Sequence, residues 1–254
     1  MALCDLHWFS QTIGKHVGTY VYIPDDVSPP FATFYLLHGL SDDYTGWMRR
    51  TSIERYAGRH RLIVVMPDGY RGFYTDNQDG PPYGRYIAEE LVATIDRLFP
   101  TIKTRESRGI GGLSMGGYGA LRLALGYPDV FSVATSHSGA VMHGSRDHPR
   151  PGGALDEVEF RRIFGPAPAG SDHDNVALAK RCSDQGILPK IRVDCGTDDE
   201  LIQDNRTLHT KLDALRIPHE YAEFPGGHNW DYWDIHVQEA MEFQARYLSA
   251  GATR

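Results

Sequence analysis

The feature that most constrains the fold of this chain is the pentapeptide G-L-S-M-G at residues 112–116, with Ser114 at its centre. A short apolar run (109–113) precedes the serine, and a helix-like run (118–125) follows it. A serine at such a strand–turn–helix junction is typical of the sharp turn that exposes a nucleophilic hydroxyl above a sheet. The flanking glycines keep Cβ atoms away from the crossing backbone. We therefore predict a strained turn at Ser114 rather than a glycine-rich loop with an incidental serine.

A nucleophilic serine needs a base, and the base needs an orienting acid. In α/β-hydrolases the acid and the histidine follow the serine in that order, each on a loop after a strand. The strand-like run 191–195 ends in G-T-D-D, which includes Asp198 and Asp199. After a helix-like run (201–215), the strand-like run 219–224 ends in P-G-G-H, with His228 last. We predict Ser114, Asp199 and His228 as the catalytic residues.

Each of these residues has another interpretation when it is taken alone. The chain contains 12 histidines, so one beside a glycine turn is unremarkable. Asp198 and Asp199 precede a helix-like run, where carboxylates commonly cap free N–H groups. The order of the three features favours catalysis. We choose Asp199 as the acid because the stretch resembles the G-x-x-D loop of esterases, which leaves Asp198 as a solvated or capping carboxylate.

The oxyanion of such a reaction is held by two backbone N–H groups, one after the nucleophile and one on the loop after an early strand. Met115 follows Ser114, and the apolar run 34–37 leads into His38, Gly39 and Leu40. We predict Met115 and Leu40 as the two donors. We expect His38 to pack beneath this loop and to hold it with a hydrogen bond, rather than to act as a second base.

Sequence motifs along nearly the whole chain resemble the short-chain acyl esterases of the esterase D / tributyrin esterase group. This resemblance implies a small acyl pocket, hydrolysis of acyl esters or thioesters by a Ser–Asp–His triad, and no cofactor. The related S-formylglutathione hydrolases usually read S-M-G-G-H, whereas Tyr118 takes the place of that histidine here, and this chain looks shorter at its N-terminus. The matching segments are 35–43, 47, 50–57, 73–76, 112–120, 194–197 and 228–233.

Composition indicates a globular protein and excludes several classes of partner. The chain has 254 residues, of which 23% are charged and 41% hydrophobic, and a net charge of −7 disfavours nucleic acid. No apolar run approaches the roughly 20 residues that cross a bilayer. Asp5 and His7 interrupt any N-terminal signal, and the 3 cysteines have no disulfide or metal spacing. We expect a cytoplasmic protein with no membrane partner, and we leave open a homo-oligomer.

Strand-like and helix-like runs alternate along the chain, which predicts a single α/β domain (1–254) with the α/β-hydrolase fold. Its expected mostly parallel sheet has helices on both faces, and its strands are nearly continuous apolar runs. The strand-like runs are 19–23, 33–38, 62–66, 109–113, 131–136, 191–195 and 220–224, and the last helix-like run is 233–248.

Residues 142–189, hereafter the cap segment, interrupt that alternation with a polar stretch rich in glycine and proline. We expect this segment to cover the site, because ligands bind at the carboxyl ends of such strands; the alternative is a surface excursion. Its histidines (His143, His148, His173) and aspartates (Asp147, Asp172, Asp174) have irregular spacing. We therefore expect solvated side chains and no metal.

The sequence thus predicts a serine carboxylesterase that acts on short-chain acyl esters, with a small-molecule ester as its partner. Tyr44, Trp47 and Trp230 are candidates for lining the substrate pocket, or for packing loops against helices. A thioesterase of the S-formylglutathione hydrolase type, a carbohydrate acetyl or feruloyl esterase, and an acyltransferase use the same residues and stay open. A ligand-binding module is disfavoured because all three triad members are present.

Overall fold

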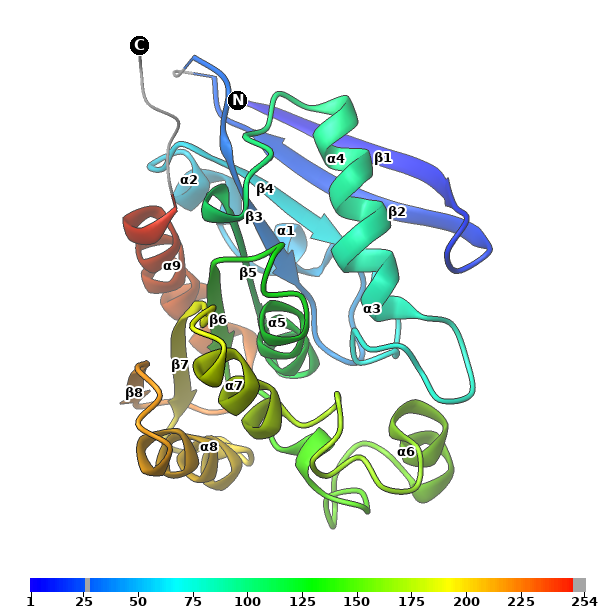
Figure 1. Cartoon of the computed structure of the whole chain (residues 1–254). Helices are drawn as coiled ribbons and strands as arrows, with labels where there is room; N and C mark the ends of the chain where they lie inside the picture. Colours follow the sequence, from blue (N-terminus) through cyan, green and yellow to red (C-terminus); the bar gives the residue numbers. More distant parts are fainter. Residues whose placement is uncertain (26–27, 249–254) are drawn as a thin grey trace.

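The computed structural model describes residues 1–25 and 28–248 (Figure 1). Within these residues, eight strands form one sheet in the order β1-β2-β4-β3-β5-β6-β7-β8. The pairs β1–β2 and β2–β4 are antiparallel, and the other neighbours are parallel, which confirms the mostly parallel sheet. The strands are β1 (Ala2–Ser10), β2 (Lys15–Ile23), β3 (Ala32–Leu37), β4 (Leu62–Pro67), β5 (Arg108–Leu113), β6 (Val133–His137), β7 (Lys190–Gly196) and β8 (Glu220–Phe224).

Helices cover both faces of the sheet, as the buried strands require. Side chains alternate along β3, so that Phe34 and Leu36 pack on one face while Tyr35 and Leu37 pack on the other. Helices α1 (Gly46–Arg50), α2 (Ile53–Ala57) and α9 (Trp230–Tyr247) supply the core on the Phe34 face. The Tyr35 face is covered by α3 (Tyr83–Arg85), η1 (Tyr86–Leu91), α4 (Val92–Leu98), α5 (Met115–Gly126), α7 (Asn175–Asp184) and α8 (Ile202–Ala214).

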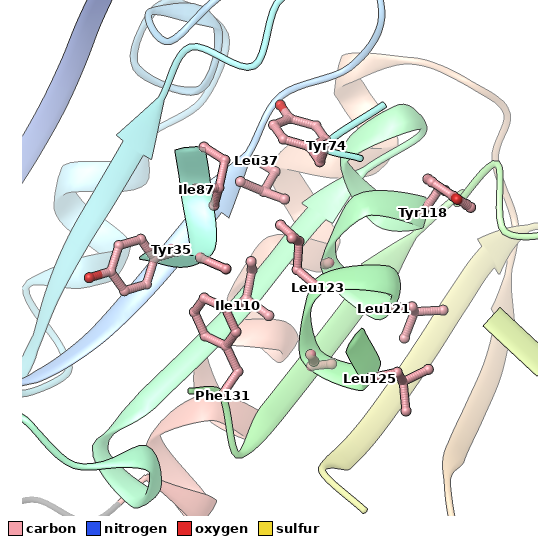
Figure 2. Packing of buried hydrophobic residues seen from close by; sticks show 14 of the residues in the cluster. Tyr35, Leu37, Tyr74, Ile87, Ile110, Tyr118, Leu121, Leu123, Leu125 and Phe131 are labelled. Carbon is pink, nitrogen blue, oxygen red and sulfur yellow. The ribbon is translucent and has the colours of Figure 1, made fainter. Parts of the chain in front are cut away.

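The core on the Tyr35 face joins α5 to the centre of the sheet. Figure 2 shows Leu123 of α5 beside Ile110 of β5 and near Phe131, while Leu121 and Leu125 point from the other side of the helix and belong to the same buried cluster. All five side chains are nearly inaccessible to water. Burial of a Leu, Ile or Phe side chain contributes about 1.5–3 kcal/mol. The first turn of α5, which follows Ser114 directly, is therefore held in place by the largest core of the molecule.

The first strand lies where the sequence analysis predicted no element. β1 pairs with β2 along its whole length, from Ala2 opposite Ile23 to Ser10 opposite Lys15. Its side chains are mostly exposed or half-buried, because β1 is the edge of the sheet. Apolar and polar residues therefore mix along it, and the run lacks the apolar signature that marks the central strands.

The cap segment contains η3 (His143–Ser145), α6 (Glu157–Phe164) and α7, and in Figure 1 α6 lies farthest from the sheet. The side chains of Asp156 and Asp174 accept hydrogen bonds from backbone N–H groups in the first turns of α6 and α7. α7 contacts α5 and α8, so it belongs to the helical layer of the sheet. The remaining short helix is η2 (Arg105–Ser107). Across the described ranges, no helix combines the length and apolarity needed to cross a bilayer.

Candidate active site

Ser114 lies in the turn that joins β5 to α5, with φ +53° and ψ −116°. This conformation is strained for a non-glycine residue, and such strain costs about 1–3 kcal/mol. The backbone N–H of Ser114 donates to the carbonyl of His137, with an N···O distance of 2.9 Å. A Cβ on Gly116 would lie 2.5 Å from the carbonyl oxygen of Leu37, so only glycine permits this approach of α5 to β3. The turn therefore raises the serine hydroxyl above the carboxyl end of β5.

His228 links Ser114 to Asp199. Its Nε2 lies 3.0 Å from Oγ of Ser114, while its Nδ1 lies 3.1 and 3.0 Å from the two carboxylate oxygens of Asp199. The neutral imidazole in this arrangement donates its Nδ1 proton to the carboxylate and accepts the serine proton at Nε2. The structure thus brings together the three residues predicted from sequence, in the geometry of a nucleophile, a base and an orienting acid.

The structure distinguishes the two adjacent aspartates. Asp198 is exposed, whereas Asp199 is buried and also accepts a hydrogen bond from the N–H of Leu201. Burial alone would raise the pKa of the Asp199 carboxyl, but the hydrogen bond and charge of His228 hold that pKa below its ordinary value. Asp199 is therefore ionised at neutral pH, as an acceptor for the imidazole proton must be.

Backbone hydrogen bonds join the loops that carry Asp199 and His228. The N–H of Thr197 donates to Phe224, and the N–H of Asp198 donates to Gly226, at N···O distances of 2.8 and 2.9 Å. Gly226 has φ +139°, a conformation that glycine adopts readily. These bonds fix the carboxylate and the imidazole relative to each other.

The loop after β3, which includes Gly39 and Leu40, lines the same cavity as Ser114 and His228. Leu40 and Met115, the predicted oxyanion donors, both line the cavity that also contains Ser114 and His228. His38 lies beneath this loop, where its Nδ1 donates to the carbonyl of Gly39 and its Nε2 accepts from the N–H of Gly69. His38 is 1% exposed. It therefore supports the loop as expected and is not available as a second base.

The cavity above Ser114, hereafter the Ser114 cavity, has a volume of about 620 Å³. Trp230 lines it, but the other two predicted pocket residues do not. Trp47 is buried behind Trp230, with ring centroids 5.3 Å apart, and its indole N–H donates to the carbonyl of Leu37. Tyr44 packs against Tyr20 and His7, away from the cavity. Both are packing residues, which was the alternative interpretation of each.

Several residues that line the Ser114 cavity were not predicted from sequence. They include Phe73, Leu155 and His143, whose imidazole is stacked on the Phe73 ring. Burial and, to a smaller extent, the charge of Arg146 lower the pKa of His143 to about 4. The expectation of solvated side chains in the cap segment is therefore wrong for His143 and Asp174, which are buried. It is also wrong for His173, which is half-buried and lies 2.8 Å from the hydroxyl of Thr75. Polar sequence context concealed all three, because only the fold shows which side of the segment faces inward.

Arginine side chains connect the cap segment to the rest of the site. Arg71 makes two hydrogen bonds of 2.8 Å to Glu159 of α6. Arg150 donates to the backbone carbonyl of Glu200, beside Asp199, at 2.7 Å. Arg71, Arg150 and Arg50 all line the Ser114 cavity, together with the carboxylates of Asp42 and Glu200. The rim of the cavity is therefore charged, while Phe73, Leu155, Trp230 and Trp233 make its deeper wall apolar.

Metal ligands were not expected in the cap segment. In the described part of the chain, one group of side chains has closely spaced metal-ligating atoms, and it comprises His209, Asp213 and His219. These residues do not line the Ser114 cavity. Cys195 is a buried residue of β7, and its burial raises the pKa of its thiol. It is thus a poor nucleophile.

A serine at a sharp turn after a central parallel strand, with histidine and aspartate on later loops of a sheet covered on both faces, defines the α/β-hydrolase fold. Residues 10–243 match the model of the esterase family described as "Putative esterase". The chain belongs to this esterase family. This result confirms the predicted carboxylic ester hydrolase and the esterase resemblance.

Three relatives illustrate the similarity. The acetyl esterase of Caldicellulosiruptor saccharolyticus is 32% identical over 97% of this chain and 99% of its own. A substrate-bound structure of the fluorophosphonate-binding serine hydrolase F of Staphylococcus aureus is 32% identical, with a TM-score of 0.86 over 96% of this chain and 98% of that one. The S-formylglutathione hydrolase structure from S. aureus is also 32% identical, with a TM-score of 0.85 and the same coverage.

Proposed function

We propose that this protein is a serine carboxylesterase that hydrolyses short-chain acyl esters through Ser114, Asp199 and His228. The observation that carries the proposal is the position of His228 between Ser114 and Asp199, with hydrogen-bond distances of about 3 Å on both sides. Membership of the esterase family supports the reaction class. The relative named acetyl esterase supports a small acyl group.

The geometry supports a two-stage reaction. His228 takes the proton of Ser114 as Oγ attacks the ester carbonyl, and Asp199 stabilises the imidazolium that forms. The N–H groups of Leu40 and Met115 hold the oxyanion, and removal of one such donor typically costs about 2.7–4 kcal/mol of transition-state stabilisation. His228 then gives its proton to the departing alcohol. In the second stage it activates water to hydrolyse the acyl-enzyme.

The charged rim of the Ser114 cavity favours short acyl groups. A long alkyl chain that leaves the apolar wall would displace water from Arg50, Arg150 and Glu200. Loss of hydration around these charged side chains is costly, so a methylene beyond the apolar wall does not gain the roughly 0.8 kcal/mol that burial otherwise contributes. The acyl group therefore fits best when it ends within the wall formed by Phe73 and Leu155.

We further propose that the described chain acts as one domain, with the part of the cap segment from His143 to Leu155 forming one side of the cavity. The ion pairs of Arg71 with Glu159 and of Arg146 with Asp204 support a docked cap. A cytoplasmic location stays a prediction from sequence.

A thioester is the second candidate substrate, because one structural relative at 32% identity is named S-formylglutathione hydrolase. Tyr118, which replaces the histidine usual in those enzymes, is buried and donates to the backbone carbonyl of His173 in the cap segment. It therefore does not offer a group to substrate. Turnover of an ester and a thioester with the same acyl group separates the two candidates.

The direct kinetic test compares p-nitrophenyl acetate turnover by the wild type, Ser114→Ala and His228→Ala. Each substitution should reduce kcat by a factor on the order of 10⁶ if the residues act as one unit. The folded state should persist, with unchanged circular dichroism. More than a few per cent of wild-type activity in Ser114→Ala would refute the proposal.

A further inference from the structure

A second aspartate, distinct from the catalytic one, is buried beneath the site. Asp194, near the end of β7, is inaccessible to water. Nδ1 of His137 lies 3.0 Å from Oδ1 of Asp194 and 2.9 Å from Oδ2. The hydroxyl of Tyr232, in the first turn of α9, donates to Oδ1 at 3.0 Å. The catalytic scheme above uses none of these three side chains.

The three residues of this cluster contact each segment that carries the triad. The backbone carbonyl of His137 accepts the N–H of Ser114, at 2.9 Å. Asp194 lies on the strand that leads into the Asp199 loop. Tyr232 follows His228 by four residues at the start of α9. The buried carboxylate of Asp194 thus connects the segments that carry Ser114, Asp199 and His228.

Tyr232 also contacts the loop between β8 and α9 (residues 225–229), hereafter the His228 loop. A Cβ on Gly226 would lie 2.8 Å from the Tyr232 ring, so the ring packs closely against this loop. The backbone N–H of Tyr232 donates to the side chain of Asn229, the residue after His228, at 3.0 Å. Burial and the nearby Asp194 charge raise the pKa of the Tyr232 hydroxyl, so it stays protonated as a donor. The phenol is therefore a fixed link between the His228 loop and β7.

A buried carboxylate is a costly way to stabilise a fold. Replacement of buried ionic groups by apolar ones is often neutral or stabilising, whereas such groups can fix a particular geometry. Here Nδ1 of His137 and the hydroxyl of Tyr232, both from neighbouring elements, lie within 3.0 Å of the Asp194 carboxylate, and Nε of Arg192 on the same strand lies 3.9 Å from it. Besides this ion pair, the two hydrogen bonds fix the orientation of Asp194 relative to His137 and Tyr232, whose segments carry the loops above it.

We propose that Tyr232 and Asp194 are positioning residues that hold His228 in line between Ser114 and Asp199. This inference rests on the proposed esterase function. A displacement of reacting groups by about 1 Å can cost on the order of 100-fold in rate. Loss of the Tyr232–Asp194 hydrogen bond should therefore reduce kcat, because it frees the His228 loop while leaving the substrate cavity intact.

The test compares Tyr232→Phe with Tyr247→Phe, which removes a hydroxyl from an exposed side chain at the other end of the same helix. Tyr232→Phe should lower kcat by about 10- to 100-fold, with KM within about two-fold of the wild type. In the plot of kcat/KM against pH, the fall of activity on the acid side should move to lower pH. The reason is that Asp199 stabilises the imidazolium of His228 less when the His228 side chain is held less firmly. Tyr247→Phe should behave as the wild type.

Wild-type kcat and pH profile in Tyr232→Phe would overturn the positioning role, even if its Tm falls. Asp194→Asn provides a second measurement, because it keeps the size of the side chain and removes the charge that both partners face. It should show the same loss of kcat without a matching change in KM. The Ser114→Ala assay tests the proposed function separately, so an inactive Ser114→Ala beside a fully active Tyr232→Phe would refute only this inference.

Discussion

Both carboxylate oxygens of Asp199 face the same nitrogen of His228, at 3.1 and 3.0 Å from Nδ1. The carboxylate is inaccessible to water, whereas the imidazole is 25% exposed. The proton of the neutral imidazole is therefore held at the buried Nδ1. The lone pair of Nε2 is left for the hydroxyl of Ser114 at the cavity side.

Asp199→Asn should be far more damaging than Asp198→Asn. The amide of asparagine does not hold the Nδ1 proton in place, and a loss of about 10⁴-fold in kcat has precedent in such triads. Asp198 is exposed, and its contact with the His228 loop uses its backbone N–H, which the substitution keeps. Steady-state kinetics on one ester check both variants. If Asp198→Asn were the crippled enzyme, the assignment of the acid would be wrong.

The kcat/KM profile should fall steeply beyond butyryl esters. A methylene contributes about 0.8 kcal/mol only while apolar wall remains to bury it. The comparison uses acetate, butyrate, octanoate and palmitate esters of one alcohol, below micelle formation. A profile that rises through octanoate or palmitate would indicate an open, lipase-like groove, although the triad would stand.

Glu159→Gln should raise KM modestly and leave kcat nearly unchanged. Glu159 holds Arg71, which lines the Ser114 cavity, but Glu159 itself does not line it. Half-exposed ion pairs contribute about 0–1 kcal/mol, so a change of up to about five-fold in KM is expected. Glu157→Gln is the control, because Glu157 pairs with Arg161 on the same helix. Equal KM values for the two variants would show that docking of α6 does not shape the cavity.

Stability should decrease as the pH falls from about 6.5 to 4, partly through His143. Its folded pKa is lowered to about 4, below the ordinary histidine value, so the unfolded state binds more protons in this window. The resulting loss is up to about 1.4 kcal/mol per pH unit. Urea denaturation at pH 6.5 and pH 5 gives the loss of unfolding free energy between the two pH values, and this loss should be smaller in His143→Gln than in the wild type by about 1.6 kcal/mol.

The matched control for the pH experiment is His148→Gln, on the exposed surface of the same segment. Its unfolding free energy should change with pH as in the wild type. An unchanged pH dependence in His143→Gln would contradict a pKa of His143 that is lowered by its burial.

The central sheet and the three proposed catalytic residues could be predicted because their signals are local. Buried strands such as β4 are continuous apolar runs, and Ser114 and His228 each follow such a run within a glycine-rich turn. The choice between Asp198 and Asp199 needed the resemblance to esterases. Burial, which separates the two residues, becomes visible only once β7 and β8 lie side by side.

Long-range contacts account for what the sequence did not reveal. Trp47 and Trp230 are both aromatic residues near predicted loops, yet only Trp230 reaches the Ser114 cavity. His143 lies in a polar stretch that looks solvated, but Phe73, about 70 positions earlier in the sequence, covers its ring. β1 was missed because an edge strand needs no continuous apolar run. Each outcome depends on pairings between segments that no local pattern encodes.

Covalent labelling of the proposed nucleophile tests the account most directly. Incubation with a fluorophosphonate ester should add one phosphonyl group per chain, in parallel with the loss of esterase activity. Peptide mapping by mass spectrometry should place that group on Ser114, and Ser114→Ala should remain unlabelled. Stoichiometric labelling at another residue, or activity that survives complete modification of Ser114, would contradict the proposed mechanism.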